Sequence, residues 1–68
     1  MDLDRLDGLL AKTLRTLENF GITTVADLTD HTRIEVLNIL KQTNYRETAY
    51  IQLANIETEL AKIGLKLS

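Results

Sequence analysis

Two pairs of cationic and polar residues are the best candidates for chemistry in this chain. Lys12 and Arg15 are three residues apart, so on a helix both side chains project from the same side, one turn from each other. Asn44 and Arg46 stand at an expected helix start, where free backbone amides attract anions. Together these four residues are candidate contacts to nucleic-acid phosphates. The alternative for Lys12 and Arg15 is a solvated helix face, which composition alone favours.

The sequence contains few residues that could support catalysis. The single histidine, His31, stands in a polar loop, where a solvated or capping role is the ordinary one. Asp2, Asp4 and Asp7 could hold a metal ion, but the positive end of a helix dipole explains acids near a helix start more simply. There is no cysteine, no glycine-rich phosphate loop and no zinc-ligand spacing. We therefore expect a non-enzymatic protein with no catalytic, metal or cofactor site.

The length and net charge of the chain restrict the functions that it could have. The chain has 68 residues, of which 44% are hydrophobic, and we expect one helical domain over residues 1–68. Its formal net charge of −2 is unlike that of a dedicated nucleic-acid binder, so DNA contacts should be local and weak. No apolar run is long enough to span a membrane and no signal-peptide layout is present. We expect a soluble, cytoplasmic protein without a membrane partner.

The periodicity predicts an all-α bundle of four to five short helices in non-parallel packing. Residues 1–8 should form an arm or short turn, and a helix over 9–20 should follow with Asp7 as its N-cap. The first helical segment as a whole, including the arm, is predicted to have one apolar face made of Leu3, Leu6, Leu10, Leu14 and Leu17. No stretch shows the alternating apolar and polar residues of a strand. The one short run with β propensity, at 22–25, is flanked by residues that end and start helices, so it is predicted to be a connector.

Glycines mark two expected helix ends. Gly21 should take the left-handed conformation just beyond a helix, which would place Ile22 against Leu17. Gly64 repeats the pattern, with Leu65 folding back towards Leu60.

Capping boxes mark three expected helix starts. They run from Thr24 to Asp27, from Thr32 to Glu35 and, more loosely, from Asn44 to Glu47. In the second helix, Ile34, Leu37 and either Val36 or Leu40 should point inward. The third box opens the longest helix, over 45–63. The buried stripe of this helix is predicted to be Ala49, Leu53, Ile56, Leu60 and Ile63. Its solvated face is predicted to be Gln52, Asn55, Thr58, Glu59 and Lys62.

The order of these elements resembles the C-terminal domain of the bacterial RNA polymerase alpha subunit, a helix-hairpin-helix or SAM-like fold. The resemblance runs through LLAKTLRTLENFGITTVADL at 9–28, TRIEV at 32–36 and LAKIGLKL at 60–67. It implies a compact five-helix fold that contacts the DNA minor groove and activator proteins. Lys12 is at the position of an arginine that enters the groove, and Arg15 is at that of an asparagine that assists it. The family's hairpin contains a glycine, whereas the corresponding segment 40–48 is longer here and has none.

The resemblance implies a transcription-linked interaction module that binds DNA weakly, binds RNA polymerase or transcription regulators, or does both. The alternative is a purely protein-binding or dimerising helical module, such as a homodimer, that has lost DNA binding. The acidic net charge and the missing hairpin glycine favour this alternative.

Overall fold

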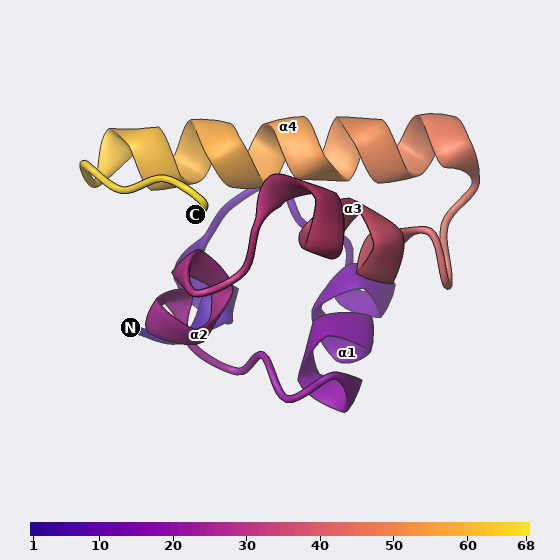
Figure 1. Ribbon diagram of the computed structural model, residues 1–68, viewed down its shortest axis with the longest axis horizontal. Coiled ribbons are helices and arrows are strands. Elements are labelled where there is room, and N and C mark those ends of the chain that lie inside the picture. Colours follow the sequence, from indigo (N-terminus) through magenta and orange to yellow (C-terminus); the bar gives the residue numbers. More distant parts are fainter.

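Four α-helices and one short 3-10 helix make up the chain. The computed structural model describes all residues from 1 to 68. The elements are the 3-10 helix Leu3–Arg5, α1 Ala11–Asn19, α2 Val25–Thr29, α3 Arg33–Leu40 and α4 Arg46–Lys62. The longest helix, α4, lies along one side of the molecule, and the other three lie beneath it (Figure 1). An isolated bridge between Asp2 and Thr24 is the only β-type pairing, so the expected all-α class is confirmed.

Both predicted glycine stops are confirmed. Gly21 has a φ of +81° directly after α1, and its N–H donates to the Glu18 carbonyl at 2.9 Å. The next amide, of Ile22, donates to the Leu17 carbonyl at 2.9 Å, and the Ile22 side chain is fully buried. This pair of bonds defines a Schellman motif, in which the carbonyls left free by the helix end find donors. Gly64 ends α4 in the same way, with a φ of +75°.

Two of the three predicted capping boxes are present. At the start of α2, the Asp27 amide donates to Thr24 Oγ1 at 3.1 Å and Asp27 Oδ2 accepts from the Thr24 amide at 3.2 Å. At the start of α3, the Glu35 amide donates to Thr32 Oγ1 at 3.2 Å and Glu35 Oε1 accepts from the Thr32 amide at 3.0 Å. These bonds satisfy amides that have no partner within the helix.

The other two predicted caps are wrong. Helix α1 begins after Leu10, which makes no side-chain cap, and Asp7 is too far upstream to reach the first turn. Helix α4 begins after Tyr45, again without a side-chain cap. Asn44 instead donates from Nδ2 to the Leu40 carbonyl at 2.9 Å. The asparagine therefore closes the end of α3 rather than opening α4.

The core lies where α4 crosses the other elements. Twelve apolar residues from all five helices and the segments between them form one cluster: Leu3, Leu6, Leu17, Ile22, Val25, Leu28, Val36, Leu40, Ala49, Leu53, Ile56 and Leu60. Both Val36 and Leu40 are fully buried on α3, whereas Ile34 is 70% exposed, so the prediction for Ile34 is wrong. Ile34 belongs to the first turn of α3, in which Arg33 and Glu35 are exposed as well.

The predicted apolar face of α1 is rotated in the structure. Its buried residues are Thr13, Thr16 and Leu17, whereas Leu10 is exposed. Leu3 and Leu6 are buried as expected, but from the separate 3-10 helix. Because the chain bends between Leu6 and Ala11, one helical period cannot be continued from the arm into α1.

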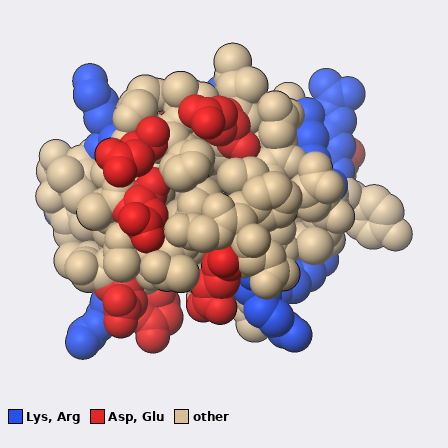
Figure 2. All heavy atoms as spheres, turned by 60° about the horizontal axis from the view of Figure 1, so that its bottom comes forward, with Lys and Arg blue, Asp and Glu red and all other residues tan.

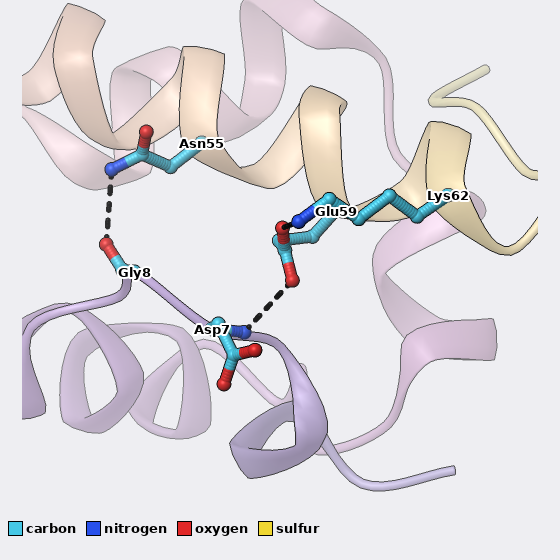
Figure 3. A network of polar contacts seen from close by, with 5 residues as sticks. All are labelled: Asp7, Gly8, Asn55, Glu59 and Lys62. Atoms are coloured by element: carbon cyan, nitrogen blue, oxygen red, sulfur yellow. Dashed lines mark hydrogen bonds and ion pairs between the residues drawn. The ribbon is translucent and has the colours of Figure 1, made fainter.

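A glutamine on α4 holds the N-terminal arm, which we define as residues 1–10. Gln52 was expected in solvent, but its side chain is buried. Its Oε1 accepts from the Leu10 amide at 3.0 Å, and its Nε2 donates to the Gly8 carbonyl at 3.3 Å. Asn55 donates to the same carbonyl at 3.0 Å (Figure 3). The arm is therefore fixed by backbone polar groups as well as by its leucines.

Farther along α4, a carboxylate joins the arm to an ammonium group. Glu59 accepts from the Asp7 amide at 3.2 Å and forms an ion pair with Lys62 at 2.6 Å (Figure 3). The bond from Lys62 and that from the Asp7 amide lower the pKa of Glu59 below its ordinary value of 4.5. The same carboxylate raises the pKa of Lys62.

Both chain ends lie beside α2 (Figure 1). The Val25 amide donates to the Met1 carbonyl at 2.8 Å, and the Ser68 amide donates to the His31 carbonyl at 3.0 Å. The N-terminus therefore contacts the start of α2, and the C-terminus contacts the segment that follows α2. Even α4, the longest helix, lacks the length and apolar content needed to cross a membrane.

Candidate nucleic-acid interface

Helix α1 contacts the segment that joins α3 to α4, which we call the connection (residues 41–45). The hydroxyls of Thr16 and Thr43 share a hydrogen bond of 2.8 Å across this contact. Thr16 also donates to the carbonyl of Lys12, one turn earlier on α1. The contact thus brings the helix that bears the first candidate pair against the segment that leads to the second.

The first pair, Lys12 and Arg15, lies on the flank of α1 next to this contact. Both side chains are exposed, whereas Thr13, Thr16 and Leu17 are buried. Since successive residues turn by about 100° around a helix, Lys12 lies next to Thr16 and Arg15 lies farther from the core on the same side. Both cations are free to meet a ligand.

Two further cations are held by an aromatic ring. The Lys41 ammonium lies 5.6 Å from the centre of the Tyr50 ring, and the Arg46 guanidinium lies 5.9 Å from it. Cations over an aromatic face are attracted by its electron density. This contact joins the start of the connection to the first turn of α4. We call Lys12, Arg15, Lys41 and Arg46 the basic end.

The basic end makes the charge of the molecule asymmetric. Within α1, the connection and the first turn of α4, four cations stand against two acids, Glu18 and Glu47. The rest of the chain carries four cations and eight acids, so the net charge of −2 divides into a positive end and an acidic remainder. Figure 2 shows Lys and Arg more densely on its right side, where α1 and the connection lie in Figure 1, and most acids to the left and centre.

Asn44 is not exposed beside the cations of the basic end. Its side chain is only 8% exposed, its Nδ2 is bonded to Leu40, and its buried Oδ1 has no hydrogen-bond partner. The asparagine therefore shapes the connection from inside. Its sequence position beside a helix start could not reveal this, because the bond closes the preceding helix.

Tyr45 takes the exposed position next to Asn44. Its side chain is 89% exposed, the highest value for any large apolar residue in the chain. The structure thus places this ring in solvent and not in the core. Lys41 was missed altogether; its nine-residue separation from Tyr50 carries no helical signal.

The connection has ordinary backbone geometry throughout. Positive φ values occur only at Gly8, Gly21 and Gly64, all outside it. None of residues 41–45 is a glycine, so each has a Cβ that hinders close approach of its backbone to a phosphate. Any anion at this end must be bound mainly by side chains.

Other parts of the molecule offer less chemistry. His31 places Nδ1 2.8 Å from the Asp27 carbonyl, a local contact at the end of α2. No three His, Asp or Glu side chains come together in a manner that could hold a metal ion. An open hollow of about 390 Å³ lies between the arm and the end of α4, lined by Met1, Arg5, Leu6, Glu59, Lys62 and Ile63.

Comparisons with protein-family models, with curated proteins and with solved structures each found no match to this chain.

Proposed function

We propose that this chain is a non-enzymatic interaction module that binds nucleic-acid phosphates weakly through its basic end. The observation that carries the proposal is the Thr16–Thr43 contact, because it joins the cations of α1 to those around the connection. The resemblance to the polymerase alpha C-terminal domain supports a role in transcription, with RNA polymerase or its regulators as protein partners.

The strength of the interaction follows from the number of cations. Each neutralised phosphate releases a counterion, so affinity falls with salt in proportion to the number of contacts. Four cations support a slope of log K against log salt of about −3 to −4 at most. The acidic remainder of the surface opposes the approach of a polyanion, so binding should be weak and easily abolished by salt.

Fluorescence anisotropy with a labelled AT-rich duplex and with a labelled single strand tests this proposal. We expect binding of at least one of them at low salt, weakening steeply between about 50 and 200 mM salt. Lys12→Ala should reduce the magnitude of the salt slope by about 1, since one phosphate contact is lost. The matched control is Lys66→Ala, which removes an exposed lysine from the C-terminal segment and should leave the slope unchanged.

Two results would contradict the proposal. One is the absence of binding to either probe at low salt. The other is an equal effect of Lys12→Ala and Lys66→Ala, which would show that only the overall charge matters.

A purely protein-binding or dimerising module is the second candidate function. It is favoured by Ile34 on α3 and Ile51 on α4, which are 70% and 59% exposed. Light scattering over a concentration series tests self-association. A molar mass that rises with concentration indicates self-association, and a constant mass of 7.7 kDa indicates a monomer. Binding to purified RNA polymerase, compared for the wild type and Ile51→Ser, tests the heterologous form of this candidate.

A further inference from the structure

We infer that the basic end prefers single-stranded nucleic acid, with an unpaired base stacking on Tyr45. This inference rests on the proposed function, because it assumes that the four cations bind phosphates. It makes the proposed function more specific by naming the class of nucleic acid, a single strand, and a residue that contacts its bases.

The first support is the position of the Tyr45 ring. It is 89% exposed and belongs to the residue directly before α4, between Lys41 and Arg46 in sequence. Those two cations lie over the ring of Tyr50, which is itself 40% exposed. Tyr45 therefore presents an uncovered aromatic ring directly before Arg46, one of the cations of the basic end.

The second support is the kind of ligand that gains from such a surface. Proteins that bind single strands combine a positive surface for the backbone with aromatic side chains on which bases stack. In a duplex the base faces are already stacked on one another, and a protruding ring could reach them only by forcing a step apart. An unpaired base is available to Tyr45 without this cost.

The third support is the backbone of the connection. Because residues 41–45 contain no glycine, their Cβ atoms hinder close approach of the backbone to a phosphate. A rigid duplex backbone cannot adapt to this obstruction, whereas a flexible single strand can bend around it to reach the cations of α1 and α4.

The test compares oligothymidylate alone with the same strand annealed to oligoadenylate, using fluorescence anisotropy at one low salt concentration. We expect the single strand to bind more tightly than the duplex. Inorganic polyphosphate serves as a backbone-only competitor, and it should displace both.

The decisive variant is Tyr45→Ser. Serine is a preferred residue at a helix N-cap, so the stability of the fold should be kept or raised while the aromatic surface is lost. Affinity for the single strand should fall by at least about five-fold, the lower limit for losing one stacked base. Tyr45→Phe keeps the ring and should bind as the wild type does. Affinity for polyphosphate should be the same for all three proteins.

The outcomes separate the two ideas. If neither nucleic acid nor polyphosphate binds at low salt, the proposed function fails and the inference falls with it. If the duplex binds as tightly as the single strand, or if Tyr45→Ser binds the single strand as tightly as the wild type does, the base-stacking inference alone is overturned.

Discussion

At the scale of single residues, backbone conformation at Gly21 determines how α1 ends. The position requires a φ of +81°, which residues with a Cβ adopt only with strain. A Cβ built at Gly21 would meet no atom within 4 Å, so the Cβ itself would cause no clash. The stability cost of replacing this glycine therefore isolates the backbone strain.

Gly21→Val should lower the free energy of unfolding by about 1–2 kcal/mol, the cost of the left-handed conformation. In a domain of this size, each kcal/mol corresponds to a fall in Tm of about 4–8 °C. Gly21→Asn is the matched control and should cost less, because asparagine tolerates this conformation. Thermal unfolding followed by circular dichroism measures both, and an unchanged Tm for Gly21→Val would refute the assignment.

At the scale of elements, the capping boxes of α2 and α3 make the stability of the fold depend on pH. The bond from the Thr23 amide and those from Thr24 lower the pKa of Asp27 below its ordinary value of 3.8. Bonds from Thr32 lower the pKa of Glu35 below its ordinary value of 4.5. A carboxyl whose pKa is lower in the folded chain stabilises the fold above its unfolded pKa, and this contribution is lost as the pH falls through the folded value.

We therefore expect the urea midpoint to fall as the pH is lowered from about 5 to about 2. The double variant Asp27→Asn and Glu35→Gln should start from a lower midpoint and lose less of it over this range. Some loss should remain, because the pKa of Glu59 is also lowered. Glu18→Gln, which removes an exposed carboxylate that caps no helix, should follow the wild type. Parallel curves for the double variant and the wild type would contradict the role of the caps.

The same elements show what the sequence could predict. Local signals located the two Thr capping boxes and the two glycine stops, whose partners lie within five residues. They misplaced the caps at Asp7 and Asn44, and they failed altogether where the partner is distant. Gln52 is buried because it bonds Leu10, 42 residues away. Likewise, the cations of the candidate site come together only because α1 packs against the connection, a contact that no helical spacing encodes.

At the scale of the whole molecule, a small core makes each central leucine important. Domains of this size rarely have more than about 3–5 kcal/mol of stability from one core. Leu53 is fully buried in the middle of α4, whereas Ile51, two residues earlier, is 59% exposed. Alanine substitutions at these two positions of one helix therefore distinguish the stability effect of burial from that of helix propensity.

Leu53→Ala should cost about 2–5 kcal/mol and leave most of the protein unfolded at room temperature. Ile51→Ala should change the stability by no more than about 0.5 kcal/mol. Helical circular dichroism, measured with and without urea, distinguishes the two variants. Similar stabilities for both would mean that α4 is not packed on its Leu53 face.

The hydrogen bonds from Val25 to Met1 and from Ser68 to His31 have a practical consequence for attaching the protein to something else. Both termini lie near α2, on the side away from the connection (Figure 1). A fluorescent tag, an immobilisation anchor or a fused domain at either terminus would therefore project away from Tyr45 and its neighbouring cations.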